Sequence, residues 1–127
     1  MEQFNLQDVL DNQLKFQENF GFTKGSKNIK ELVELIHTHS HFAVEETFEM
    51  LRELPYHKYW ADYSDLTGNE IIEKFKLAQK EFIDVFIFLM NVALFLGLDS
   101  ERIYELYREK QKINIQRQND PELGYVK

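Results

Sequence analysis

The sequence predicts an all-α protein, an antiparallel four-helix bundle. Apolar residues recur at helical spacing in four segments, and no segment keeps the two-residue alternation of a strand. Five glycines and two prolines give little material for the many turns of a β-sandwich. Two of the helical segments are long and their connections are short, which favours antiparallel neighbours. With 127 residues, the chain has the size of one domain, expected to span residues 1–127.

The first two helices are expected at about residues 4–18 and 27–53. Between them lies a loop with two glycines, in which Ser26 is placed to cap the second helix. Apolar side chains keep a 3.6-residue period through the second helix. Pro55 cannot continue that helix and ends it. An aromatic-rich loop, residues 56–66, follows.

The third and fourth helices are expected at about residues 68–96 and 100–117. Thr67 is the predicted N-cap of the third helix, Gly97 ends it, and Asp99 or Ser100 caps the fourth. Val85–Leu98 is the most apolar stretch, and Asn91 lies in its middle. The stretch is shorter than the roughly 18–20 residues that cross a bilayer. The second half of the third helix is apolar on nearly all sides, which predicts a homodimer with a shared helical core.

Composition excludes several classes of protein. The chain has no cysteine, so it has no disulfide framework and no thiolate zinc site. Its net charge of −7 argues against a nonspecific nucleic-acid binder, which needs lysine and arginine to displace counterions. The N-terminus is acidic and mixed, without the basic start and apolar run of a leader. We therefore expect no nucleic-acid or membrane partner and a cytoplasmic location.

Two pairs of acidic residues carry the strongest chemical signal. Glu46 and Glu49 lie three apart on the second predicted helix, and Glu81 and Asp84 lie three apart on the third. Each pair projects from one helix face, so facing helices place four carboxylates around one point. Like charges repel there unless a hard cation such as Mg²⁺ takes the oxygen atoms as ligands. The alternative is that either pair belongs to an ordinary solvated helix face.

Cationic and aromatic residues form two further candidate binding segments. Lys110, Asn114 and Arg117 share a face of the fourth helix and suit phosphate oxygens, although a solvated, salt-bridged helix has the same pattern. In the loop after the second helix, Lys58 and Trp60 could hold a phosphate and stack a base, or the aromatics could cap the bundle. The three histidines at positions 37, 39 and 41 suggest zinc, but no HExxH motif accompanies them, and structural or solvated roles are favoured.

Together these features resemble the all-α NTP pyrophosphatase superfamily, which includes the MazG-like proteins and the dimeric dUTPases. That superfamily is marked by ExxE on one helix and ExxD on the next, both binding Mg²⁺. Here these motifs are Glu46-Thr-Phe-Glu49 and Glu81-Phe-Ile-Asp84. The resemblance extends from about Leu6 to Tyr125.

Further segments are similar to the dimeric dUTPase branch. Leu6–Asp11 resembles its N-terminal motif, and Lys58–Trp60 resembles its Lys–aromatic–Trp segment. Tyr107–Gln118 and Gly124–Tyr125 resemble its C-terminal phosphate-binding motif and terminal Gly-Tyr. Two positions depart from this branch. Many of its members have a histidine where this chain has Ile87, and Asn91, seven residues after Asp84, follows the MazG-like pattern instead.

The resemblance implies an Mg²⁺-dependent enzyme that converts dUTP to dUMP and pyrophosphate. It implies that Glu46 or Glu49 orients or deprotonates the attacking water. Gln7 is expected to read the base. The remaining substrate contacts are expected from Lys58, Trp60, Lys110, Asn114 and Arg117. Two alternatives remain open: the same reaction on dCTP or another canonical or modified deoxynucleotide, and a non-catalytic helical dimerisation module.

Overall fold

The computed structural model describes residues 3–56, 58–120 and 122. They contain four helices, α1 (Leu6–Glu18), α2 (Ile29–Glu53), α3 (Gly68–Phe95) and α4 (Ser100–Asn119). No strand occurs in these described ranges. The all-α class is therefore confirmed, and each helix lies close to its expected position. The terminal pair Gly124–Tyr125 falls outside the described residues.

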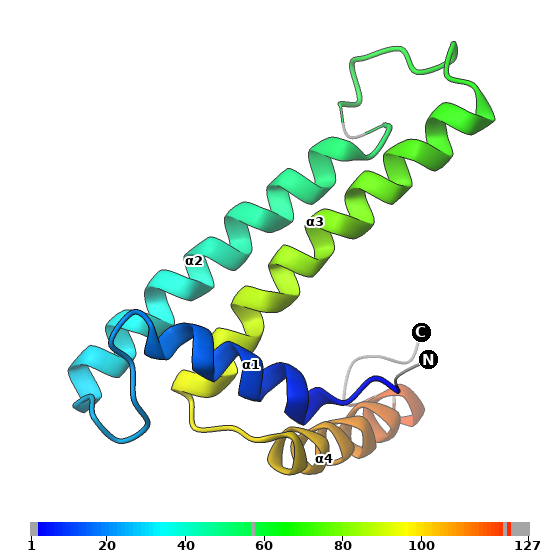
Figure 1. Ribbon diagram of the computed structural model, residues 1–127. Helices are drawn as coiled ribbons and strands as arrows, with labels where there is room; N and C mark the ends of the chain where they lie inside the picture. The colour runs from blue at the N-terminus through cyan, green and yellow to red at the C-terminus, as the bar shows by residue number, and fades with distance from the viewer. Residues whose placement is uncertain (1–2, 57, 121, 123–127) are drawn as a thin grey trace.

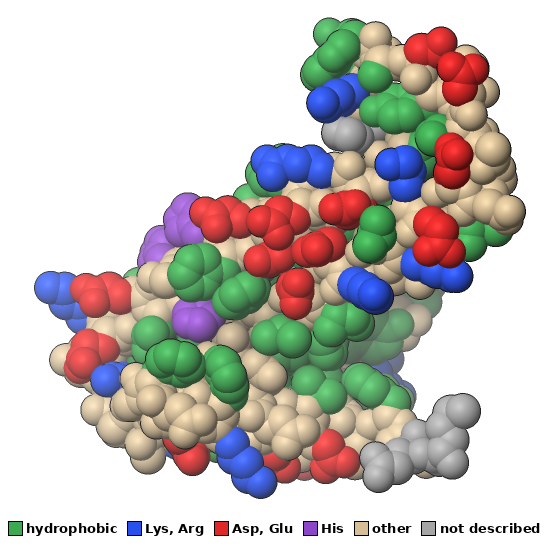
Figure 2. Space-filling view, turned by 45° about the horizontal axis from the view of Figure 1, so that its top comes forward, with side chains coloured by type: hydrophobic (Ala, Val, Ile, Leu, Met, Phe, Trp, Pro, Cys, Tyr) green, Lys and Arg blue, Asp and Glu red, His purple; other side chains and the backbone are tan. Residues whose placement is uncertain are grey.

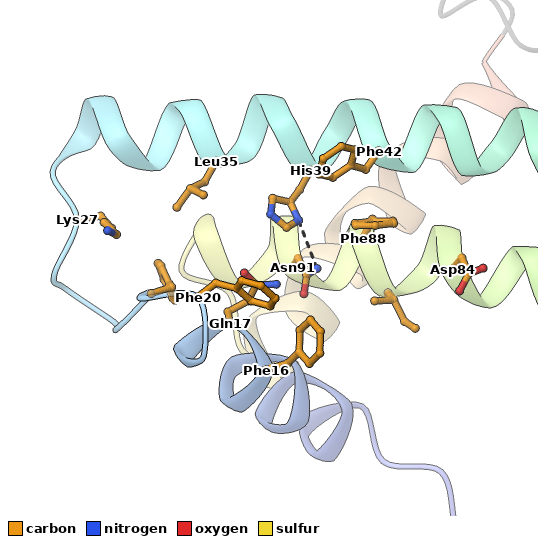
Figure 3. A pocket seen from close by; sticks show the side chains of 12 residues that line it. Phe16, Gln17, Phe20, Lys27, Leu35, His39, Phe42, Asp84, Phe88 and Asn91 are labelled. Atoms are coloured by element: carbon orange, nitrogen blue, oxygen red, sulfur yellow. Dashed lines mark hydrogen bonds between the residues drawn. The ribbon is translucent and has the colours of Figure 1, made fainter.

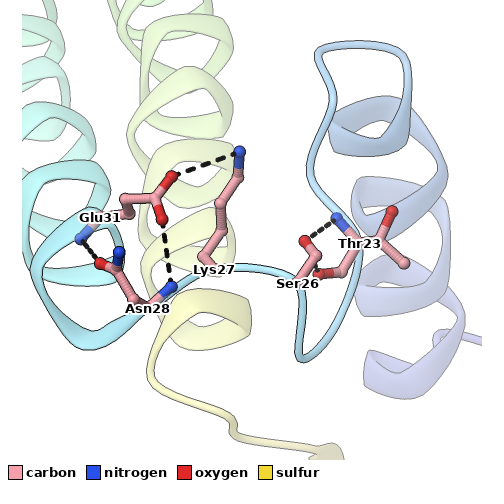
Figure 4. A network of polar contacts seen from close by, with 5 residues as sticks. All are labelled: Thr23, Ser26, Lys27, Asn28 and Glu31. Atoms are coloured by element: carbon pink, nitrogen blue, oxygen red, sulfur yellow. Dashed lines mark hydrogen bonds and ion pairs between the residues drawn. The ribbon is translucent and has the colours of Figure 1, made fainter.

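A capping box fixes the start of α2 (Figure 4). The Asn28 side chain accepts a hydrogen bond of 2.8 Å from the Glu31 backbone N–H, and the Glu31 carboxylate accepts one from the Asn28 N–H. The prediction that Ser26 caps this helix is wrong. The Ser26 hydroxyl instead donates to the carbonyl of Thr23 and closes a turn in the preceding loop, because Asn28 already satisfies the first turn of α2.

Capping residues also fix the start of α3 and the corner between α3 and α4. Thr67 forms the expected capping box with Glu70 at the start of α3. After Phe95 the chain turns through Gly97, whose φ of 77° lies in the left-handed region. Asp99 then accepts a 2.8 Å hydrogen bond from the Arg102 N–H and caps α4. The residue types at these positions therefore determine where α3 ends and α4 begins.

The helices divide into a long hairpin and a crossing pair (Figure 1). α2 and α3 lie side by side along their length, and the chain reverses between them through the loop at residues 54–67. α1 crosses the far end of this hairpin and packs on α3. α4 is bent away from α3 by 101° and, among the described helices, contacts only α1. The four described helices thus do not all pack against one another.

The buried core lies where α1 meets the end of α3. Leu10, Ala93 and Leu94 form its centre, and Leu10 is only 1% exposed. The hairpin is covered less completely. Large apolar side chains remain exposed at heptad-like spacing on α3 and at i, i+4, i+7 spacing on α2: Ile72, Phe75, Phe82 and Leu89, and Val44, Phe48 and Leu51.

Among the described residues, no individual helix combines the length and apolarity of a membrane span. α3 and α4 together satisfy the criteria of length and composition, but only as the pair bent by 101°.

Replacing Thr67 by alanine tests the cap of α3. Thr67→Ala removes the side-chain acceptor for the Glu70 N–H and should lower the free energy of unfolding by about 1 kcal/mol. Thr67→Ser keeps the hydroxyl and is the matched control, expected to remain close to the wild type. Chemical denaturation followed by circular dichroism measures both, and equal losses in the two variants would contradict the role of the cap.

Candidate metal centre and adjoining cavity

An acidic cluster lies where the middle of α2 faces α3. Glu46 comes from α2, and Glu81 and Asp84 come from one face of α3. One carboxylate oxygen from each of the three residues lies within 4.8 Å of the others. Figure 2 shows acidic side chains gathered on one surface of the hairpin. The structure therefore brings together three of the four predicted metal ligands.

Glu46 carries the electrostatic cost of this arrangement. Burial, followed by hydrogen bonding and repulsion from Glu49 and by repulsion from Asp84 and Glu81, together raise the pKa of Glu46 to about 7. No donor among the described residues reaches its buried Oε2 atom. A buried carboxylate oxygen without a donor is costly and is relieved by a cation.

The cluster has the dimensions and ligand type of a divalent cation site. Mg²⁺ binds oxygen at about 2.1 Å, so opposite ligands lie about 4.2 Å apart. The carboxylate oxygens of Glu46, Glu81 and Asp84 lie within 4.8 Å of one another, so small side-chain movements bring them to this separation. Glu49 is outside this group but interacts with Glu46, one turn away on α2. The four residues could hold a metal ion together with water or phosphate oxygens.

A cavity of about 530 Å³ adjoins the acidic cluster, and Asp84 belongs to both (Figure 3). Aromatic side chains from three parts of the chain form its walls. Phe16 and Phe20 come from α1 and the loop after it, Phe42 comes from α2, and Phe88 comes from α3. The Phe42 and Phe88 rings lie 5.2 Å apart in a tilted arrangement. The cavity has a volume typical of small-molecule sites, which span about 300–1,000 Å³.

Two buried amides give this apolar cavity polar groups. Asn91 is 2% exposed and Gln17 is 6% exposed, and both line the cavity. Asn91 is hydrogen-bonded to Gln13 and lies 3.3 Å from the His39 ring. No hydrogen bond joins the Gln17 amide to another side chain drawn in Figure 3. Buried amides normally have partners, so a ligand with polar edges would complement this cavity.

Gln7 occupies a different place from the one its predicted base-reading role suggests. Its Oε1 accepts a 3.0 Å hydrogen bond from the Ser100 N–H at the start of α4, and its Nε2 donates to Asp11 at 2.9 Å. Gln7 is not among the residues that line the cavity. The amide thus joins α1 to α4, and its contact with a base remains a prediction.

The predicted phosphate-binding residues lie away from the acidic cluster within one chain. Lys110, Asn114 and Arg117 are on α4, which contacts neither α2 nor α3 among the described helices. Lys58 and Trp60 are exposed in the loop between α2 and α3. The Trp60 ring meets Tyr59 edge-on, with centroids 5.1 Å apart. Their substrate roles also remain predictions.

No protein-family model matches the chain, and no curated protein or solved structure matches it significantly. Function is therefore inferred from the residues of the site. Sequence reasoning found the acidic cluster but missed the cavity. The signal that pointed to the cavity was Asn91, a polar residue within an apolar helix, which needs a buried partner.

Glu46→Gln tests the electrostatic strain in the cluster. Because the folded-state pKa of Glu46, about 7, exceeds the unfolded value, the folded state binds the proton more tightly. This contribution to the free energy of unfolding falls as pH rises from about 4.5 to 7. Without metal, Glu46→Gln should therefore be more stable than the wild type at pH 8, with a smaller advantage at pH 4.5.

Denaturation of metal-free protein at both pH values measures this difference. Glu45→Gln, at an exposed neighbouring position of α2, is the matched control. If Glu46→Gln and Glu45→Gln show the same change with pH as the wild type, the strain does not originate at Glu46.

Proposed function

We propose that this protein is an Mg²⁺-dependent nucleoside triphosphate pyrophosphohydrolase that converts dUTP to dUMP and pyrophosphate, acting in the cytoplasm. The observation that carries the proposal is the position of the Glu46, Glu81 and Asp84 cluster beside an aromatic cavity that Asp84 also lines. The cluster suits a metal-bound triphosphate, and the cavity suits a planar base. The sequence motifs ExxE and ExxD support the same assignment.

The carboxylates supply the site for the metal and for the attacking water. Bound Mg²⁺ supplies charge neutralisation and polarises phosphoryl oxygens, which lets a protein of net charge −7 accept a polyanion. Glu81 and Asp84 serve as ligands. Glu46 or Glu49 orients the water and accepts its proton. The oxygen of that water forms the new bond to phosphorus, and the bond to the pyrophosphate leaving group breaks.

The cavity accommodates the base. Phe16, Phe42 and Phe88 offer ring faces and edges for stacking, and the amides of Asn91 and Gln17 offer donors and acceptors at its edges. Since Asp84 lines both the cavity and the cluster, a base in the cavity places its phosphates near the carboxylates. This continuity favours a nucleotide over an isolated phosphate.

A second copy of the chain completes the proposed enzyme. The exposed apolar stripes on α2 and α3 provide the surface for a homodimer in which helices of the two copies form an antiparallel four-helix bundle. Such a dimer also gives Lys58, Trp60, Lys110, Asn114 and Arg117 of the second copy a route to the phosphates. Gln7 remains an expected contact to the base.

Two other functions account for part of the structure. Carboxamides pair with cytosine as well as uracil, so the same reaction on dCTP or a modified deoxynucleotide fits the cavity. The exposed stripes by themselves fit a non-catalytic dimerisation module. The acidic cluster favours the enzyme, because a dimerisation module has no need to bury Glu46 beside Glu81 and Asp84.

Asp84→Asn should lower turnover by about 100-fold or more, because it removes a charged metal ligand while preserving side-chain shape. Pyrophosphate release from a panel of deoxynucleoside triphosphates with Mg²⁺ measures this loss and identifies the preferred base. Asp8→Asn, at an exposed position of α1, is the control and should retain activity. Near-normal turnover by Asp84→Asn would remove Asp84 from the metal site.

Mg²⁺ should raise the thermal midpoint of the wild type through preferential binding to the folded state. The stabilisation is about 2.7 kcal/mol when free metal exceeds its Kd 100-fold. The shift should be largely absent in Glu81→Gln. Differential scanning calorimetry with and without Mg²⁺ measures it. An equal shift in the wild type and Glu81→Gln would place the bound metal elsewhere.

A further inference from the structure

Three helices meet at the amide of Asn91. Its Oδ1 atom accepts a 2.9 Å hydrogen bond from Nε2 of Gln13 on α1. Its Nδ2 atom lies 3.3 Å from Nδ1 of His39 on α2 (Figure 3). Asn91 itself belongs to α3 and is 2% exposed. The amide is therefore held at both ends by side chains from the two other helices that border the cavity.

The protonation state of His39 determines whether the oxygen or the nitrogen of the Asn91 amide faces the ring. The ring packs among Phe42, Phe88 and Phe95, with centroids 4.9–5.9 Å away. Burial lowers the pKa of His39, which favours the neutral ring. A neutral ring with its proton on Nε2 leaves Nδ1 as an acceptor for the Asn91 N–H. Gln13 then donates to the Asn91 oxygen, so each hydrogen bond among the three side chains pairs a donor with an acceptor.

Among the described residues, the hydrogen bonds to Gln13 and His39 leave one acceptor position and one donor position of the Asn91 amide for a ligand. An amide oxygen accepts two hydrogen bonds and an amide nitrogen donates two, and Gln13 and His39 use one of each. Uracil and cytosine present opposite patterns at the relevant edge, since the 4-oxo group is an acceptor and the 4-amino group is a donor. An amide that rotates freely can pair with either base, whereas an amide held in one orientation matches only one.

We propose that Asn91 contacts the edge of a pyrimidine base in the cavity, and that Gln13 and His39 are positioning residues that select between 4-oxo and 4-amino pyrimidines by fixing the Asn91 amide. This inference rests on the proposed function, because it takes the cavity ligand to be a nucleotide. It goes further by assigning base selectivity to a hydrogen-bonded chain of three side chains. It also differs from base reading by Gln7, whose amide is bonded to Ser100 and Asp11.

His39→Phe tests the positioning role. Phenylalanine suits the aromatic surroundings of His39 but offers no acceptor to Asn91. We expect the ratio of dUMP to dCMP affinity to move at least about 10-fold toward one, mainly through weaker binding of the preferred base. His39→Asn places an amide oxygen near the position of Nδ1 and should restore part of the ratio. A loss of packing alone would weaken both nucleotides equally and leave the ratio unchanged.

Binding and turnover are measured separately. Isothermal titration without metal gives the dUMP and dCMP affinities, and pyrophosphate release with Mg²⁺ gives kcat/KM for dUTP and dCTP. Asn91→Leu removes the proposed contact to the base, and its ratio should also approach one. Asn12→Ala, at an exposed position of α1, is the matched amide control and should keep the wild-type ratio. Gln7→Ala tests the competing assignment of base reading to Gln7. Thermal unfolding confirms that each variant is folded, and His39→Phe decides the matter if Asn91→Leu does not fold.

The outcomes separate this inference from the proposed function. If the wild type hydrolyses no nucleotide but its affinity ratio collapses in His39→Phe, the positioning chain stands and the pyrophosphohydrolase assignment fails. If the wild type hydrolyses nucleotides and the ratio is unchanged in His39→Phe, the inference is overturned and the enzyme stands. A wild type that binds both monophosphates equally, or binds neither, also overturns the inference, and so does a ratio that collapses only in Gln7→Ala.

Discussion

The packing of α2 against α3 is the constraint on which the other features depend. It brings Glu46 next to Glu81 and Asp84, and it supplies two walls of the aromatic cavity. The hairpin thus places carboxylates and phenylalanines in adjacent stretches of one interface, where Glu46 and Glu81 are half-buried and Asp84 is exposed. The apolar stretch stabilises the packing through burial, while the acidic stretch opposes it until a cation neutralises the charge. Burial first, and then the neighbouring carboxylates, raise the pKa of Glu46 to about 7, which reflects that opposition.

Local signals in the sequence were sufficient to predict the helices. Thr67, Gly97 and Asp99 have side chains or backbone freedom that are specific to helix ends, and each lies at such an end in the structure. Ser26 misled the prediction because serine, asparagine and threonine compete for the same capping role within a few residues of loop. Asn28 takes that role through its bond to the Glu31 N–H.

The candidate site was predictable only in the part built from helix spacing. An i, i+3 pair must share a face, so Glu81 and Asp84 could be paired from the sequence. The cavity depends instead on how α1 crosses the hairpin, which no local pattern encodes. For the same reason, the bond from Gln7 to Ser100 and the contacts of Asn91 with Gln13 and His39 were not foreseen. Each joins residues that lie far apart in the sequence.

The bond between Gln7 and Ser100 spans 93 residues, and this separation has a kinetic consequence. Closing so long a loop is entropically costly, whereas α2 and α3 are consecutive helices joined only by the loop at residues 54–67. We expect the hairpin to form early and α1 to dock late, after the end of α3 and the start of α4 are in place. The acidic cluster, made wholly by the hairpin, would then be assembled before the cavity has its third wall. An ion that binds this cluster would therefore stabilise the hairpin itself, whether or not α1 is docked.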